Sequence, residues 1–279
     1  MREINAASIT EIVKKLCIEA NCCLGEDMKA RILESYAQET WQPAKEILTQ
    51  IIDNYTLAKK ENQPICQDTG MTCVFLKIGQ DVHIAGDLTQ AVNEGVRMGY
   101  AEGYLRKSVV KDPLDRVNTG DNTPAVLYTE LVPGEQVEIT VAPKGFGSEN
   151  MSAVKMLRPS DGVEGVKDFV VQTVKAAGPN PCPPIVVGVG IGGTFDKASY
   201  LAKKALIRDV SQPNPQPYYA DLEKELLERI NALGIGPQGL GGKTTALAVN
   251  IETYPTHIAG LPVAVNISCH VNRHKTEVL

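Results

Sequence analysis

Long apolar runs are missing from this chain of 279 residues. A helix that spans a membrane needs about 18 or more consecutive apolar residues, and no segment approaches that length. The amino terminus, MREINAASITEIVKK, carries acidic residues and lacks the apolar centre of a secretion signal. The sequence therefore predicts a cytoplasmic protein without a membrane span.

An excess of positive charge is also missing. The formal net charge is -5 at pH 7, which argues against nucleic acid as a main partner. No internal repeat, low-complexity tract or clear linker interrupts the chain. The length suits one large domain or two small ones, and it is ample for a real core.

The closely spaced cysteine pairs of many metal sites are absent too. The chain has 7 cysteines, an odd number, and none of them forms a C-x-x-C motif. In a reducing compartment this pattern favours metal ligands or free thiols over a disulfide framework. We interpret Cys17, Cys22 and Cys23 as core or surface thiols, because no group of ligand type flanks them. Cys73 alternates with Val74 in a predicted strand, and we interpret it as a core residue.

Apolar periodicity divides the chain into a helical beginning and a mixed remainder. The first sixty residues predict helices, and we expect an α/β (or α+β) fold with a helical N-terminal region followed by mixed sheets with packed helices. Two hairpins are expected, one turning at Gly79-Gln80 and one at Pro133-Gly134. The expected strands cover 72–78, 81–85, 125–131, 136–142, 185–187, 246–251 and 261–268, and the later helices cover 87–105, 162–177, 194–208 and 218–233.

Three cysteines stand in loops or at strand ends among polar or proline residues. Cys66 lies in Pro64-Ile65-Cys66-Gln67-Asp68-Thr69-Gly70, which precedes an apolar run. Cys182 lies among four prolines, where the backbone is stiff, and Cys269 ends the last apolar strand. Each is compatible with an idle loop thiol, and the Cys66 loop with a simple Asx turn. If the three act together, thiolates select zinc or an iron–sulfur cluster.

Two glycine motifs resemble nucleotide sites and fall short of them. Gly188, Gly190 and Gly193 match G-x-G-x-x-G between a strand and a helix, and we expect them to form a tight turn that could hold an anion. The acidic residue that a dinucleotide site needs after a second strand is missing. Before Gly242-Lys243-Thr244, Pro237 stands where a phosphate loop has glycine, so that spacing fails by one residue.

Other segments carry groups that suit substrate binding, and each of them also has a purely structural interpretation. Arg106 follows a predicted helix and is either a solvated helix end or a fork for a carboxylate. The segment Lys144-Gly145-Phe146-Gly147-Ser148-Glu149-Asn150 is either an anion-binding nest or a flexible connection. His257 lies between Pro255 and Pro262, where a histidine is more often a loop residue than a catalytic group.

Four separated motifs together resemble class I, iron–sulfur fumarate hydratases, in the form of the alpha subunit of the two-subunit enzymes, and L-tartrate dehydratase alpha subunits, which share the fold. They are Ile65 to Gly70, Lys144 to Asn150, Gly190-Ile191-Gly192-Gly193-Thr194 and Cys269-His270-Val271-Asn272-Arg273-His274. The resemblance covers the whole chain. It implies one catalytic domain, residues 1–279, with a helical region at 1–62 and a cluster-binding α/β region at 63–279.

The resemblance also implies the site. A [4Fe-4S] cluster would be held by Cys66, Cys182 and Cys269. Asp68 and His257 would be acid/base or orienting groups, and the sequence does not assign the base. Substrate contacts would fall on Gln67, Arg106, Gly145 and Gly147. The family usually has three glycines in a row here, and Phe146 departs from that pattern.

The expected reaction is the reversible hydration of fumarate to L-malate, with an open iron acting as Lewis acid. The resemblance implies further catalytic groups on a separate beta subunit, an alpha2-beta2 assembly and weak activity of the isolated chain. L-tartrate dehydration is the alternative within the class. A nicotinamide-dependent oxidoreductase using 188–193, and a zinc-binding scaffold subunit, are the alternatives from other classes.

Overall fold

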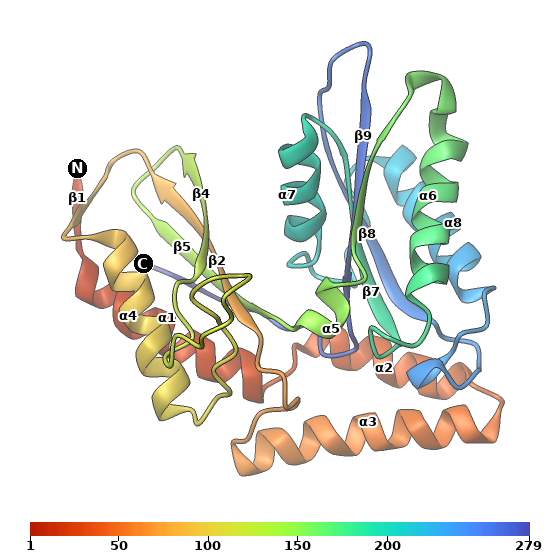
Figure 1. Ribbon diagram of the computed structural model, residues 1–279, viewed down its shortest axis with the longest axis horizontal. Helices are drawn as coiled ribbons and strands as arrows, with labels where there is room; N and C mark the ends of the chain where they lie inside the picture. The colour runs from red at the N-terminus through yellow and green to blue at the C-terminus, as the bar shows by residue number, and fades with distance from the viewer. The chain divides into compact units, whose positions relative to one another are not determined.

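The computed structural model describes residues 1–279, and the chain separates into two compact units. Unit 1 comprises residues 1–25, 54–146 and 273–279, and unit 2 comprises residues 26–53 and 147–272. The boundary passes through the helix α3 (Gln42–Glu61). Each unit has its own four-stranded sheet (Figure 1). Each also has its own apolar core.

The sheet of unit 1 has the strand order β10-β5-β2-β4. Its strands are β2 (Met71–Gly79), β4 (Val126–Val132), β5 (Val137–Lys144) and β10 (Lys275–Val278). Strand β2 pairs in parallel with β4 and antiparallel with β5, so the sheet is mixed. A separate parallel pair joins β1 (Arg2–Asn5) to β3 (Val82–Ala85).

The helices α1 (Ala6–Cys22) and α4 (Leu88–Glu102) form the helical layer of unit 1. They pack closely because α4 has glycine where it meets α1. A Cβ at Gly95 would lie 2.6 Å from Thr10 O, and one at Gly99 would lie 2.8 Å from Cys17 Cβ. Their apolar residues share one core with those of β2 and β5, among them Val13, Leu16, Val96, Leu76 and Ile139.

The sheet of unit 2 has the order β6-β9-β7-β8 and is also mixed. Its strands are β6 (Ala153–Leu157), β7 (Ile185–Gly192), β8 (Ala246–Tyr254) and β9 (Leu261–Ser268). Strand β7 is parallel to β8 and antiparallel to β9. The amino ends of β7 and β8 and the carboxyl end of β9 therefore share one edge of the sheet, which we call the lower edge (Figure 1).

Helices cover both faces of this sheet (Figure 1). The helices α6 (Gly162–Ala177) and α8 (Pro217–Asn231) share a large apolar core with the strands. The helix α7 (Phe195–Ala205) lies against the opposite face. Unit 2 also contains α2 (Glu26–Gln38), the first part of α3, most of α5 (Phe146–Glu149), and the short helices η1 (Pro159–Asp161) and η2 (Pro237–Gly239).

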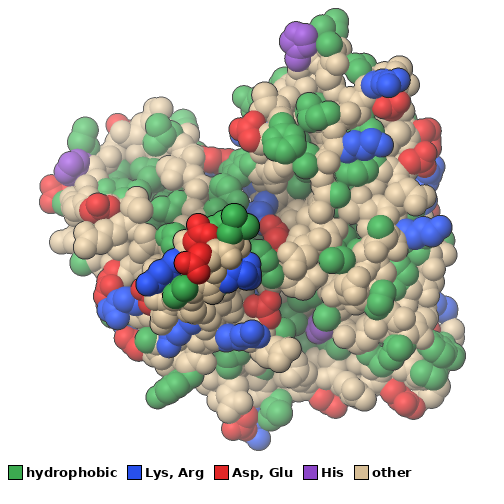
Figure 2. Space-filling model, viewed as in Figure 1, with side chains coloured by type: hydrophobic (Ala, Val, Ile, Leu, Met, Phe, Trp, Pro, Cys, Tyr) green, Lys and Arg blue, Asp and Glu red, His purple; other side chains and the backbone are tan.

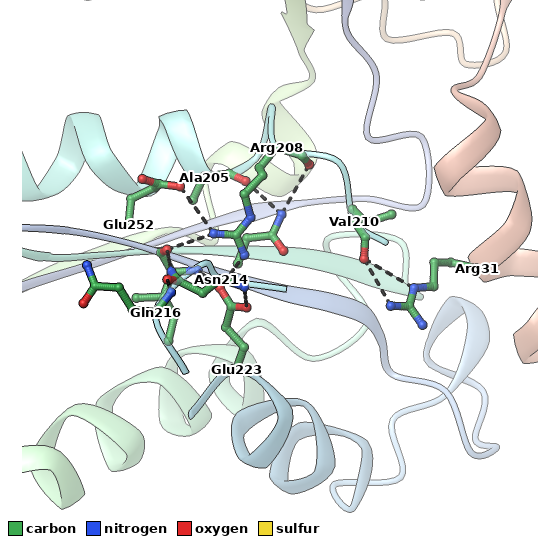
Figure 3. A network of polar contacts seen from close by, with 10 residues as sticks. Arg31, Ala205, Arg208, Val210, Asn214, Gln216, Glu223 and Glu252 are labelled. Carbon is green, nitrogen blue, oxygen red and sulfur yellow. Dashed lines mark hydrogen bonds and ion pairs between the residues drawn. The ribbon is translucent and has the colours of Figure 1, made fainter. Parts of the chain in front are cut away.

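Two partly buried ion pairs support the outer side of β8, the last strand of the sheet (Figure 3). Arg208 pairs with Glu223 and with Glu252. The Glu223 carboxylate also accepts hydrogen bonds from the amides of Ile251 (2.7 Å) and Asn214 (2.9 Å). Side chains thus form hydrogen bonds with backbone groups that an unpaired edge strand would leave exposed.

The predicted fold class is confirmed, whereas several local predictions are wrong. Neither expected hairpin forms, because β2 pairs with β4 and β5 while β3 pairs with β1. The expected glycine turn at 188–193 is largely strand, since β7 continues to Gly192. A Cβ at Gly188 or Gly190 would overlap a carbonyl oxygen of α7, so these glycines serve close packing of helix on sheet. Strands β1, β6 and β10 were not expected.

None of the helices combines the length and the apolar character that crossing a lipid bilayer requires.

Candidate active site

The loop of residues 64–70 connects α3 to β2 and is fixed at both ends. The amide of Ile65 donates to the Asn21 carbonyl at 2.9 Å, and the Asn54 side-chain amide donates to the Ile65 carbonyl at 2.8 Å. At the other end, the buried Tyr100 hydroxyl donates to the Thr69 carbonyl at 2.6 Å. Burial raises the pKa of Tyr100, so this phenol stays protonated and able to donate.

Gly70 is the residue that lets this loop close onto the next strand. Its φ is +76°, and a Cβ would lie 2.7 Å from the carbonyl carbon of Lys144. The buried Asn122 donates to the Gly70 carbonyl at 3.1 Å and accepts from the Ser108 amide at 2.7 Å. The loop therefore has one backbone path, set by groups from three other segments.

Asp68 has the most defined side chain of the loop. Its Oδ1 accepts from the Gly70 amide at 3.0 Å, and its Oδ2 accepts from the Phe146 amide at 2.9 Å. The buried Arg273 donates to the Asp68 carbonyl. A Cβ at Gly145 would lie 3.1 Å from Oδ2, so the small residue lets the backbone come close to the carboxylate.

Polar groups around Asp68 are available to a ligand. The side chains of Gln67 and Arg106 are exposed and have no hydrogen-bond or ion-pair partner. The backbone of Arg106 is nevertheless fixed, because Thr69 Oγ1 donates to its carbonyl at 2.9 Å. Cys66 is partly exposed. Elsewhere, cationic and anionic side chains are interspersed on the face shown in Figure 2.

In unit 2, Cys182 and Cys269 lie at the same edge of the sheet. Cys182 precedes the start of β7 by three residues, and Cys269 directly follows β9. Because Val186 pairs with Ser268, both cysteines belong to the lower edge. Cys182 is exposed between the buried residues Pro181 and Pro183, and its φ is +55°.

His270 joins the two cysteine loops. Its Nδ1 lies 2.9 Å from the Cys182 carbonyl oxygen. A carbonyl oxygen only accepts, so Nδ1 carries the proton and donates. The glycine segment approaches the same place, since a Cβ at Gly147 would lie 3.8 Å from the Asn180 carbonyl oxygen.

His257 lies elsewhere in unit 2. It stands in the turn that leads from β8 to β9, where its Nδ1 accepts from the Ala259 amide at 3.2 Å. That turn is at the upper edge of the sheet, opposite Cys182 and Cys269. The eight residues of β9 span roughly 23 Å between the two edges. The predicted site residues of unit 2 therefore separate into two places.

The other cysteines are placed as expected for structural thiols. Cys17, Cys22 and Cys73 are buried, and Cys23 is partly buried. Burial raises the pKa of the Cys17 thiol to about 12, and burial also raises that of Cys22. Thiols that resist ionisation are poor metal ligands. None of the seven cysteines forms a disulfide.

No group of three or more His, Cys, Asp or Glu side chains is arranged to hold a single metal ion. Cys66 belongs to unit 1, whereas Cys182 and Cys269 belong to unit 2. The structure thus brings two of the three predicted ligand loops together and fixes the third within the other unit.

The sequence profile of the family described as "Fumarate hydratase (Fumerase)" matches residues 10–278. The chain belongs to this family. A protein of Methanocaldococcus jannaschii named "Putative L(+)-tartrate dehydratase subunit alpha" is 46% identical over 272 residues, which are 95% of each chain. The L(+)-tartrate dehydratase subunit alpha of Escherichia coli (strain K12) is 34% identical over 272 residues, 96% of this chain and 89% of the relative.

Family membership confirms the resemblance noted in the sequence and assigns the chain to a hydro-lyase family. Several residues that shape the site were not singled out from the sequence. Tyr100 continues the apolar spacing of Val92 and Val96 along α4, a pattern that indicates burial and no role in a site. Asn122 and Gln238 had no local signal, because their partners lie far away in the sequence.

Proposed function

We propose that this chain is the alpha subunit of a [4Fe-4S]-dependent hydro-lyase for four-carbon dicarboxylates. Family membership carries the proposal, and the site supports it. A fixed loop presents Cys66, Gln67 and Asp68 in sequence, with the unpaired Arg106 anchored to the same loop. These groups are what binding and dehydrating a small hydroxy acid require.

The residues present suit the proposed cluster. Cys66, Cys182 and Cys269 are the more accessible cysteines outside the helical beginning of the chain, while Cys17, Cys22 and Cys73 are buried. Three thiolates select zinc or an iron–sulfur cluster over harder metals. We assign Cys66, Cys182 and Cys269 as the ligands. A cluster held by these three thiolates would leave one iron without a protein ligand, and that iron would supply a Lewis acid for the hydroxyl and a carboxylate of the substrate.

Arg106 and Gln67 are the proposed substrate-binding side chains. The guanidinium of arginine presents paired donors that match a carboxylate, and at Arg106 no internal acceptor competes for them. The Gln67 amide offers a donor and an acceptor for a hydroxyl or the second carboxylate. In the glycine segment, Gly145 and Gly147 leave the backbone open to a close approach by substrate.

Asp68 is the proposed acid/base or orienting group of this chain. Two backbone amides hold its carboxylate, one at each oxygen, which fixes its direction without occupying every lone pair. A carboxylate held in this way moves little during proton transfer, and preorganisation of this kind is what catalysis uses.

His257 is proposed to act from a second copy of the chain. It lies at the opposite edge of the unit 2 sheet from Cys182 and Cys269, so it cannot serve the site formed by those two residues of its own chain. An assembly with two alpha chains would supply it in trans. The resemblance implies such an assembly, alpha2-beta2, and the relatives are named as alpha subunits.

The proposed reaction is the reversible addition of water to fumarate, which gives L-malate. In the reverse direction a carbon-bound proton and the hydroxyl of malate leave as one water molecule. The names of the relatives favour L-tartrate as a second candidate. Loss of one water from tartrate gives the enol of oxaloacetate, so the two substrates require the same groups.

The test is an anaerobic assay of the chain together with its beta subunit. Fumarate formation from L-malate is followed by ultraviolet absorbance, and oxaloacetate formation from L-tartrate by a coupled reduction. We expect turnover of one of them at 1–10³ s⁻¹, the ordinary range for enzymes, and weak turnover by the chain alone. Turnover of neither by the reconstituted complex would refute the proposal.

A further inference from the structure

The glycine-rich segment 236–242 fails as a phosphate loop, yet the structure gives it a clear position. It lies in unit 2 and follows α8 at a distance of a few residues. A Cβ at Gly239 would overlap Pro179, which belongs to the loop that carries Cys182. The segment therefore packs directly against the cysteine loop.

Gln238 donates two hydrogen bonds to a single atom of that loop. Its backbone amide donates to the Pro183 carbonyl at 2.7 Å, and its side-chain amide donates to the same oxygen at 2.8 Å. The φ of Gln238 is +53°, which is uncommon for a residue other than glycine and is held only where the surroundings enforce it. Both donors converge on the residue next to Cys182.

The same side chain also reaches the second cysteine loop. Gln238 Nε2 lies 3.4 Å from His270 Nδ1. That nitrogen donates to the Cys182 carbonyl at 2.9 Å, so its approach to Nε2 is a packing contact. Gln238 thus touches the carbonyl after Cys182 and the imidazole after Cys269.

The segment is anchored at its far end by Glu39. The buried Glu39 carboxylate accepts from the Lys243 amide at 2.7 Å, and a Cβ at Gly241 would lie 3.0 Å from Trp41. A support fixed at both ends can hold what it touches in one orientation. Groups behind a metal ligand commonly act in this way.

We infer that Gln238 is a positioning residue for Cys182, which it holds in the orientation required of a cluster ligand through Pro183 and His270. The inference rests on the proposed function, because it assumes that Cys182 binds iron. Gln238 itself touches neither the cluster nor the substrate.

The experiment compares Gln238→Met with Gln172→Met. Methionine at position 238 keeps the size of the side chain and removes the side-chain amide donor. The control position, Gln172, is an exposed residue of α6 whose side chain has no partner. Each chain is reconstituted anaerobically with iron and sulfide, and iron release to a chelator is timed. Ligand-supporting groups are worth 10–100-fold in metal affinity, so we expect about tenfold faster release from Gln238→Met only.

A second pair tests the packing contact. Gly239→Ala and Gly234→Ala both place alanine at a positive φ, +77° and +65°, but only position 239 meets a neighbour. We expect faster iron release from Gly239→Ala than from Gly234→Ala.

The cluster-free proteins provide a readout that needs no iron. Hydrogen exchange at the Cys182 amide, which donates to the Pro179 carbonyl at 3.1 Å, should become about tenfold faster in Gln238→Met and Gly239→Ala. The melting temperature of Gln238→Met should stay within about 4 °C of the wild type. That of Gly239→Ala, whose Cβ overlaps Pro179, is compared with that of Gly234→Ala.

The outcomes separate the two claims. A wild-type chain that takes up no iron would overturn the proposed function and the inference with it. A wild-type chain that binds a cluster, with equal iron release and equal exchange in Gln238→Met, would overturn the inference alone.

Discussion

The backbone amide of Phe146 donates to Asp68 Oδ2 at 2.9 Å. Phe146 interrupts a glycine run that resembles three successive glycines in the family, yet the contact to Asp68 comes from its backbone. Its side chain is 47% exposed and takes no part in that contact. The departure from glycine at this position therefore leaves the hold on the carboxylate intact.

Asp68→Asn should abolish most activity while the chain still folds. The variant loses the negative charge of the carboxylate. Its NH₂ group also faces one of the two backbone amides that donate to Asp68 in the wild type, so one of these hydrogen bonds is lost. Loss of a general acid or base costs about 10²–10⁴-fold in rate. The measurement is kcat at matched iron content. Asp81→Asn, an exposed aspartate of the same unit, is the control. A near-normal kcat in Asp68→Asn would show that Asp68 is not a general acid or base in the reaction.

Gly70→Ala should unfold unit 1 more readily than Gly120→Ala. Both glycines have positive φ, +76° and +87°, but a Cβ at Gly70 would lie 2.7 Å from the Lys144 carbonyl carbon, whereas one at Gly120 has open space. The backbone strain alone costs about 1–2 kcal/mol at each position. We expect Gly70→Ala to lose at least about 2 kcal/mol more, since the clash adds to the strain. Denaturant unfolding measures both. Equal losses would show that the loop can shift away from Lys144.

Glu39→Gln should destabilise unit 2 at neutral pH. Burial alone would raise the pKa of Glu39, but hydrogen bonds from the amides of Trp41, Lys243 and Thr40 hold it below its ordinary value. Hydrogen bonds to a charged group contribute about 1.5–3 kcal/mol, and the glutamine loses part of this.

The same pKa shift gives the effect of Glu39 a pH dependence. Because the folded-state pKa is lowered, its stabilisation is complete above the unfolded pKa of about 4.3 and disappears as pH falls through the folded value. The difference in unfolding free energy between wild type and Glu39→Gln should therefore narrow below about pH 4. A difference that stays constant from neutral to acidic pH would contradict this account.

The proposed role of His257 in trans can be tested by complementation. Chains with Cys66→Ser and chains with His257→Ala should each be inactive alone. In a mixed pair, the His257→Ala chain keeps the cluster ligands and the Cys66→Ser chain keeps His257, so one of the two sites is complete. Random pairing makes half of the pairs mixed, so about a quarter of wild-type activity should return. If no activity returns, His257 and Cys66 must serve a site within the same chain. Full activity of the His257→Ala chain alone would show that His257 takes no part in the reaction.

The spans of several helices and strands were well predicted from the sequence. The spans of α4, α6, α7 and α8, and those of β2 and β9, follow from apolar spacing and from stop signals such as Gly178. Cys182 and Cys269 were singled out because each lies at a strand end, and the antiparallel pairing of β7 with β9 explains why both reach one edge.

What the sequence did not predict depends on partners that are distant along the chain. Turn signals at Gly79-Gln80 suggested a hairpin, but β2 pairs instead with a strand some sixty residues later. The glycines at 188 and 190 serve the approach of α7, which no local pattern reports. His257 was grouped with the cysteines by resemblance, and only the strand order shows that it lies at the other edge.

The most direct test of the proposed cluster is anaerobic iron and sulfide analysis with a visible spectrum. It compares the wild-type chain with Cys182→Ser and with Cys73→Ser, whose buried thiol we expect to be structural. The account predicts about four irons and four sulfides per chain in the wild type and in Cys73→Ser, with loss of the cluster in Cys182→Ser. A colourless, iron-free wild type after careful reconstitution would contradict it.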